Sequence, residues 1–174
     1  MYRDAKEKTN CVRGCNNEWI EPRVVRLYTE HDIAAGRLVA LNANQTHYLR
    51  NVMRVGPGDP VTLFNGRDGE WAAQVETIGK KSGVLMAQHC LRRQVAEPGP
   101  HLYFAPLKRG PLDFLVQKAV ELGVAALQPV LTERTVVSRV NHDRLRANII
   151  QAAEQCGRRS TPDLRCTTKQ HLLL

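Results

Sequence analysis

The Pro- and Gly-rich segment "AEPGP" at residues 96–100 limits the fold more than any other stretch of the sequence. Before it, hydrophobic residues occur in short runs separated by turn residues, and after it they follow the pattern of strand, helix and strand. Such segments interrupt regular structure and commonly separate domains. The sequence therefore predicts a linker at 96–100 between domains at 23–95 and 101–174. Residues 1–22 show neither helical nor alternating hydrophobic periodicity and are predicted to be a disordered tail.

The short runs of residues 23–95 predict a small β-barrel. They include "VVRLYTE", "PVTLFNG", "EWAAQVETI" and "VLMAQHCLRR", which together suggest about five strands joined by glycine-bearing turns. One helix interrupts them, "NANQTHYLRNVMRV", with Asn42 or Asn44 as its cap and Leu49, Val52 and Met53 as its apolar stripe. This inventory is typical of a small, partly open barrel.

Residues 101–174 predict an α/β unit with parallel strands. "HLYFAPL" and "VAALQPVL" read as buried strands, and "RGPLDFLVQKAVELG" between them reads as a helix that starts near Pro111 and stops at Gly123. A second helix, "NHDRLRANIIQAAEQCG", places Cys156 at the end of an inward-facing stripe. A doubly wound sheet needs more elements than these. The ending "CTTKQHLLL" either begins a third strand or has no partner.

The charge of the chain favours a phosphate-rich partner. It has 25 Lys and Arg against 17 Asp and Glu, a formal charge of +8 and a pI of about 9.6. Such a balance indicates nucleic-acid binding, with a merely soluble basic protein as the alternative. The five cysteines are irregularly spaced, which favours a reduced, cytoplasmic setting. Cys11 and Cys15 lack a second pair of ligands, so we expect no metal site. No apolar run approaches the ~20 residues of a membrane span.

Two loops of the α/β unit carry candidate ligand-binding residues. Lys108 and Arg109 follow the first strand, at the carboxyl edge where open sheets bind ligands, and the next helix points its N-terminus there. The alternative is a solvated loop with two charges. "TERTVVSR" adds Arg134 after the second strand. Lys118 and Glu121 are spaced as an exposed ion pair, although both flank the apolar stripe and could reach the sheet edge.

Several classes of enzyme lack their signature in this chain. There is no Walker sequence, no dinucleotide-binding glycine pattern between a strand and a helix, and no G-x-S-x-G. We expect Cys156 to be a buried thiol rather than a nucleophile, because it lies on the apolar stripe.

Several motifs occur in a fixed order: "HYLRNVMRVGPGD", "LFNG", "LKRGPLDFLVQKAVELGV" and "AAEQCGRRSTPDLR". With them, residues 24–170 resemble the bacterial RsmE family of ribosomal RNA methyltransferases. The resemblance implies an α+β, PUA-like RNA-binding barrel followed by a SPOUT-type α/β knot domain. It also implies transfer of a methyl group from S-adenosylmethionine to N3 of a uridine in 16S ribosomal RNA, on the small ribosomal subunit, by a homodimer.

The sequence departs from the family in its cofactor loops. Family members carry a "GPEGG"-like loop and an "LG-x-R-I-L-R"-like loop around the methyl donor, and neither occurs here. We therefore expect a member truncated before the knot, whose cofactor-binding residues cannot be assigned. The alternative is an RNA-binding module without catalytic activity.

Methylation of uracil N3 requires removal of a proton and cations beside the developing negative charge. We assign the base to Glu121 or Glu154, and the stabilisation of charge or phosphate to Arg158 together with other arginines of the α/β unit. The predicted RNA contacts are Arg26, Arg50 and Arg54 of the barrel and Lys108, Arg109, Lys118, Arg134 and Arg159 of the α/β unit.

Overall fold

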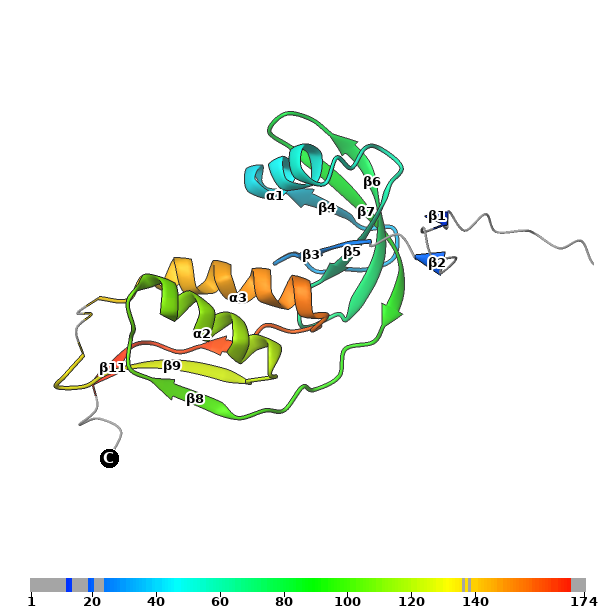
Figure 1. Cartoon of the computed structure of the whole chain (residues 1–174). Coiled ribbons are helices and arrows are strands. Elements are labelled where there is room, and N and C mark those ends of the chain that lie inside the picture. Colours follow the sequence, from blue (N-terminus) through cyan, green and yellow to red (C-terminus); the bar gives the residue numbers. More distant parts are fainter. Residues whose placement is uncertain (1–11, 14–18, 21–23, 136, 138, 170–174) are drawn as a thin grey trace, which may run out of the picture.

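The computed structural model describes residues 12–13, 19–20, 24–135, 137 and 139–169. Most of the predicted tail and the final "QHLLL" lie outside the described residues. Strand β1 (Val12–Arg13) pairs antiparallel with β2 (Trp19–Ile20). The remaining elements form two sheets on either side of residues 96–100, with two long helices packed on the second sheet (Figure 1).

The first sheet has five strands in the order β3-β5-β6-β7-β4. Their bounds are β3 Val25–Tyr28, β4 Leu38–Leu41, β5 Pro60–Phe64, β6 Glu70–Ile78 and β7 Gly83–Arg92. Strands β3 and β5 are parallel and the other pairs are antiparallel. The long strands β6 and β7 curl the sheet around a core that includes Leu63, Val75 and Leu85 (Figure 1). This curled sheet, called the barrel below, confirms the predicted fold of the N-terminal half.

The predicted helix of the barrel is two short helices. In α1 (Ala43–His47), the side chains of Asn42 and Gln45 each accept a hydrogen bond from the other residue's backbone N–H, a capping box. A π-helix, η1 (Tyr48–Val52), follows directly. The predicted apolar stripe is wrong beyond Leu49, because Val52 is 59% and Met53 is 40% exposed. A π-helix has more residues in each turn than an α-helix, so Val52 and Met53, three and four positions after Leu49, do not lie on the same face of the helix as Leu49.

The second sheet confirms the predicted βαβ unit. Strands β8 (His101–Phe104), β10 (Asp163–Leu164) and β11 (Thr168–Lys169) all pair parallel with β9 (Ala126–Leu131). Helix α2 (Arg109–Glu121) connects β8 to β9, and α3 (His142–Cys156) precedes β10. The ending of the chain thus does contribute a strand, through Thr168 and Lys169.

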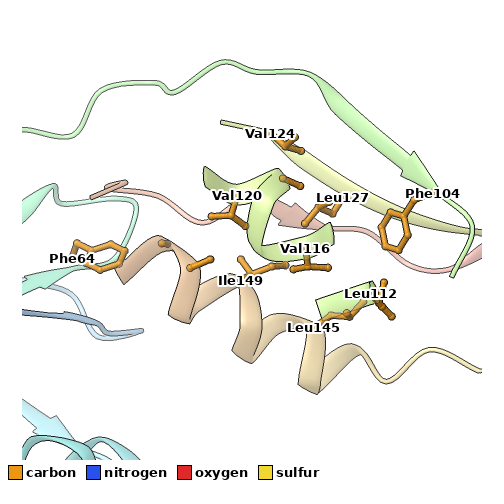
Figure 2. Packing of buried hydrophobic residues seen from close by; sticks show 12 residues of the cluster. Phe64, Phe104, Leu112, Val116, Val120, Val124, Leu127, Leu145 and Ile149 are labelled. Carbon is orange, nitrogen blue, oxygen red and sulfur yellow. The ribbon is translucent and has the colours of Figure 1, made fainter. Parts of the chain in front are cut away.

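The two long helices pack their apolar stripes against each other and the sheet (Figure 2). Val116 and Val120 of α2 are fully buried, as is Ala153 of α3. The predicted burial of Cys156 is wrong, since this side chain is exposed. Ala153 is the last buried position of the stripe, and the chain leaves the helix one residue after Cys156, at Gly157.

Helix α3 ends at a residue whose backbone favours glycine. Gly157 has φ 79°, the left-handed region that other residues adopt at a cost. We expect Gly157→Ala to lower the free energy of unfolding by about 1 kcal/mol, because alanine is strained there even though its Cβ would meet nothing within 4 Å. Urea unfolding measures this difference.

Gly110 provides the matched control. A Cβ at Gly110 also meets nothing within 4 Å, but this glycine lies inside α2 without a positive φ. Gly110→Ala should therefore leave stability unchanged or raise it by up to about 1 kcal/mol, following helix propensity. Equal effects of the two substitutions would contradict the role of the left-handed backbone at Gly157.

Candidate functional site

A buried carboxylate, Glu70, lies where the barrel meets the α/β unit. Its side chain is 7% exposed and accepts hydrogen bonds from Nε of Arg26, at 2.7 Å, and from Nε of Arg92. Burial alone would raise the pKa of Glu70, but the hydrogen bonds from Arg92 and Arg26 outweigh it and the pKa lies below its usual value. Glu70 is therefore ionised at neutral pH and orients both guanidinium groups.

Arg26 extends from β3 to the C-terminal end of α3. Its Nη1 donates to the carbonyl oxygens of Ala153 and Glu154 at 2.9 and 3.0 Å, and its Nη2 donates to that of Arg158 at 2.8 Å. Arg92 donates to the carbonyl oxygen of Gly157 at 2.9 Å. The last carbonyls of a helix lack partners within the helix and carry partial negative charge. The two barrel arginines therefore cap α3 and join the two units.

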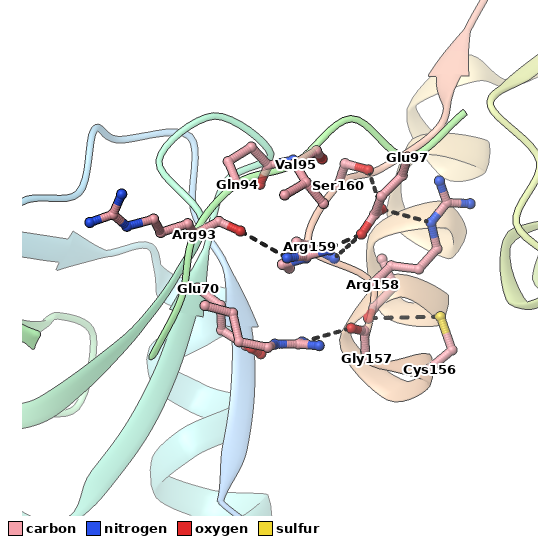
Figure 3. Close-up of polar contacts among 12 residues, drawn as sticks. Glu70, Arg93, Gln94, Val95, Glu97, Cys156, Gly157, Arg158, Arg159 and Ser160 are labelled. Carbon is pink, nitrogen blue, oxygen red and sulfur yellow. Dashed lines mark hydrogen bonds and ion pairs between the residues drawn. The ribbon is translucent and has the colours of Figure 1, made fainter. Parts of the chain in front are cut away.

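The segment after α3 makes a second set of contacts, to the linker (Figure 3). Glu97 accepts hydrogen bonds from Ser160 Oγ at 2.5 Å and from Arg159 Nε at 3.4 Å, and Arg158 Nε lies 3.5 Å from it. Arg158 also donates to the carbonyl oxygen of Val124 at 2.8 Å, just after α2. Arg159 donates to that of Arg93 at 2.8 Å. The guanidinium groups of Arg158 and Arg159 are thus held by protein acceptors.

Glu154 lies beside the barrel near the end of α3. Its Oε1 accepts a hydrogen bond from the backbone N–H of Tyr28 at 2.9 Å. Burial raises the pKa of Glu154, and the hydrogen bond from Tyr28 and the charge of Arg26 offset only part of this effect. The residue borders two openings between the barrel and α3, with volumes of 720 and 480 Å³.

The structure places the predicted site residues at two opposite ends of the α/β unit. Lys108, Arg109 and Arg134 follow the carboxyl ends of β8 and β9. Helices α2 and α3 run back along the sheet, so Glu121, Glu154 and the arginines after α3 lie at its other end, next to the barrel (Figure 1). The loops that follow β8 and β9 therefore share one edge of the sheet, and Glu121 and Glu154 lie away from that edge.

Glu121 is part of an exposed ion pair. Lys118 Nζ lies 2.6 Å from its Oε2, and Gln117 donates to its Oε1 at 2.8 Å. The hydrogen bonds from Lys118 and Gln117 hold the pKa of Glu121 below its usual value. A carboxylate stabilised in its charged form is a weak proton acceptor. The arrangement is that of an ordinary surface pair.

Arg50 and Arg54 are exposed on the barrel, close in sequence to Tyr48 and Met53, which line the larger opening. Arg50 lies in the π-helix, and Arg54 follows Met53 with φ 57°, a value uncommon for residues other than glycine. Among the contacts of the described residues, neither side chain forms a hydrogen bond or an ion pair with the protein. Both guanidinium groups therefore remain available to a ligand.

The described residues form neither a metal-ion site nor a helix that could span a membrane. Within them, no three His, Cys, Asp or Glu side chains come together as a metal site. No helix in that part of the chain has the length and apolar character needed to cross a bilayer.

Comparison with known proteins gives matches in both halves of the chain. Residues 41–85 match an RNA methyltransferase PUA domain, and residues 97–174 match an RNA methyltransferase domain. A relative in Rickettsia conorii, ribosomal RNA small subunit methyltransferase E, is 30% identical over 138 residues, covering 79% of this chain and 57% of the relative. The protein of that name from Neisseria gonorrhoeae, solved with S-adenosyl methionine, is 30% identical with a TM-score of 0.76.

The alignment to the Neisseria structure covers 84% of this chain and 62% of that one. A Legionella pneumophila methyltransferase solved with its cofactor SAM is also 30% identical, with a TM-score of 0.77 and coverage of 85% and 64%. The order of the two matched domains defines an RNA methyltransferase architecture with a PUA barrel. Within that class, the chain belongs to the RsmE family. It spans less than two thirds of the length of these relatives.

The contact around Glu70 predicts a specific loss of stability. We expect Glu70→Gln to lower the free energy of unfolding by about 3 kcal/mol at pH 7, because Arg26, whose side chain is only 16% exposed, is then left without its counter-charge. Glu76→Gln is the matched control, since Glu76 is exposed on the same strand and should change stability by less than about 0.5 kcal/mol. Urea unfolding of both variants measures the difference.

The same contact predicts a pH dependence. The pKa of Glu70 in the folded protein lies below its usual value of 4.5, so its ionised form stabilises the fold above that pH. This stabilisation is lost as the pH falls through the folded pKa. The stability difference between wild type and Glu70→Gln should therefore be constant near neutral pH and shrink in acid. A difference that grows in acid would contradict the ionised state of Glu70.

Proposed function

We propose that this protein acts in S-adenosylmethionine-dependent methylation of N3 of a uridine in 16S ribosomal RNA. The observation that carries the proposal is the fixed pairing of a PUA barrel with a parallel α/β unit through Glu70 and Arg26. The names of the Rickettsia and Neisseria relatives support ribosomal RNA as the substrate, and the Neisseria structure supports the cofactor.

The proposed RNA contacts are the basic side chains that remain open to solvent. They comprise Arg50 and Arg54 of the barrel and Lys108, Arg109 and Arg134 at the carboxyl edge of the second sheet. Arg26, Arg158 and Arg159 act through the protein instead, because they hold the two units together. Lys118 lies in the exposed pair with Glu121.

The chemistry of the reaction needs a base and nearby cations. Loss of the N3 proton makes an anion, and Lys108 and Arg109 supply positive charge at the carboxyl edge where such ligands bind. Of the two candidate bases, Glu154 has the raised pKa suited to accepting a proton, whereas Glu121 is paired. Glu154 lies at the opposite end from Lys108 and Arg109, so the identity of the base stays a prediction.

The described residues do not form an evident pocket for the methyl donor. S-adenosylmethionine supplies the methyl group when bound, and cofactor phosphates and nucleosides are commonly approached closely by glycine backbone. The loop after β8 contains one glycine, Gly110, and a Cβ built there would meet nothing within 4 Å. This loop is open and does not form a cradle for the donor.

The proposal includes finer assignments. The relatives' names support the small ribosomal subunit as the setting, and a cytoplasmic location is the one in which ribosomal RNA is modified in bacteria. A homodimer is part of the proposal, supported by the apolar side chains of Phe114 and Leu122, which are 63% and 81% exposed on and just after α2. The proposed domain organisation is a barrel at residues 23–95, a linker at 96–100 and an α/β domain at 101–174.

An RNA-binding module without catalytic activity is the second candidate function. The open loop around Gly110 favours it. Calorimetric titration of the 174-residue chain with S-adenosylmethionine separates the two functions. Binding at micromolar concentration is the result expected for the methyltransferase, and a lack of binding at that concentration would favour the RNA-binding module.

RNA binding by the barrel arginines is tested by salt dependence. We expect Arg50→Gln with Arg54→Gln to weaken binding to single-stranded RNA and to reduce the slope of log affinity against log salt by about 0.7 for each lost phosphate contact. Lys80→Gln with Lys81→Gln is the matched control, since it removes the same charge from the exposed β6–β7 turn. An identical slope in the wild type and the arginine variant would exclude these arginines from the interface.

A further inference from the structure

The larger opening between the barrel and α3 is a cleft lined by residues of both units. Its volume is 720 Å³. Tyr48 and Met53 contribute from the barrel, and Gln151, Glu154 and Gln155 contribute from α3. Clefts of this size between two rigid units are common positions for ligands.

The barrel wall of this cleft is apolar and partly aromatic. Tyr48 is 38% exposed and Met53 is 40% exposed, so both present apolar surface to the cleft. Tyr48 begins the π-helix, and its carbonyl oxygen accepts a hydrogen bond from the N–H of Met53 at 3.0 Å. π-Helical turns often occur at functional sites. An exposed aromatic ring on an RNA-binding module is suited to stacking against an unpaired base.

The α3 wall of the cleft offers hydrogen-bonding groups. Gln151 and Gln155 are one helical turn apart and exposed, and each amide provides donors and an acceptor. Neither amide has a hydrogen-bond partner among the described residues. Glu154 uses Oε1 for the N–H of Tyr28, so its Oε2 remains as a further acceptor. A mixed set of donors and acceptors matches the edge of a nucleobase.

Arg26 lines the cleft, and two further arginines lie close in sequence to the barrel residues that line it. Arg50 lies two residues after Tyr48, and Arg54 directly follows Met53. The left-handed backbone of Arg54 lies within a turn closed by a hydrogen bond from Val55 N–H to the carbonyl oxygen of Leu49, at 2.9 Å. The turn fixes the backbone of Arg54 directly after Met53. Exposed aromatic rings with arginines nearby are the combination that binds single-stranded nucleic acid.

We propose that this cleft binds one unpaired nucleobase of the RNA, stacked on Tyr48 and hydrogen-bonded by Gln151 and Gln155. The inference rests on the proposed RNA substrate. The cleft lies at the barrel end of α3, whereas Lys108 and Arg109 lie at the carboxyl edge of the second sheet. The bound base is therefore a different nucleotide from one that reacts at the carboxyl edge, and its recognition selects the RNA sequence.

The test uses the full chain and short single-stranded RNAs that carry 2-aminopurine at one position each. Stacking on an aromatic ring quenches the fluorescence of this base. We expect wild type to quench one position strongly, and Tyr48→Ala to lose that quenching with roughly tenfold weaker binding. Tyr48→Phe should retain both. Tyr103→Ala is the matched control, since Tyr103 is 49% exposed on β8, outside the cleft.

A second variant leaves the barrel unchanged. Gln151→Ala with Gln155→Ala alters only exposed positions of α3, where alanine favours the helix, so the protein should remain folded. We expect this variant to keep the quenching and to lose discrimination between RNAs that differ at the quenched position.

The outcomes separate the two proposals. If Tyr48→Ala quenches and binds as wild type does, the nucleobase site is overturned while RNA binding stands. If the glutamine variant discriminates between RNAs as wild type does, base-edge recognition by α3 is overturned. If wild type binds none of the RNAs, both the nucleobase site and the proposed function fail.

Discussion

The buried carboxylate of Glu70 determines how the two halves of this protein fit together. It holds Arg26 and Arg92 in the orientation in which they reach the carbonyl oxygens at the end of α3. Replacing both partners of a buried ion pair by well-packed apolar residues often changes stability little. Removing one partner alone leaves an uncompensated buried charge and is destabilising. The carboxylate, the arginines and the helix end therefore depend on one another. Arg26 also lines the cleft beside Tyr48.

The elements that sequence patterns predicted well are those with local signals. Helix α3 has a capping asparagine, an apolar stripe and a terminal glycine, all within the helix or next to it. The contact around Glu70 has no such signal, because Arg26 and Glu70 are 44 residues apart. Irregularities in the pairing of β6 with β7 also break the simple alternation of faces near Glu70, so periodicity does not identify it as buried. The π-helix after His47 was not predicted, because its sequence resembles that of an ordinary α-helix.

The arginines after α3 show how one charge pattern serves two purposes. Cations at a helix end suit a phosphate ligand, and they equally suit the free carbonyls of a helix C-terminus. Sequence alone favoured the first interpretation for Arg158. In the structure its guanidinium group lies against the carbonyl of Val124 and the carboxylate of Glu97. Only the positions of α2 and the linker decide between the two, and these are properties of the tertiary fold.

The long sequence separation of the Arg26 contacts has a consequence for the order of folding. The strands of the barrel pair within residues 25–92, whereas Arg26 reaches Ala153, 127 residues further along the chain. Contacts between residues distant in sequence form late in folding, because closing a long loop costs conformational entropy before the contacts themselves contribute any stabilisation. During synthesis the barrel can thus assemble while α3 is still being made. Glu70 already has Arg92 beside it at that stage. The barrel therefore presents a pre-formed binding site for the end of α3, which docks after the barrel has folded.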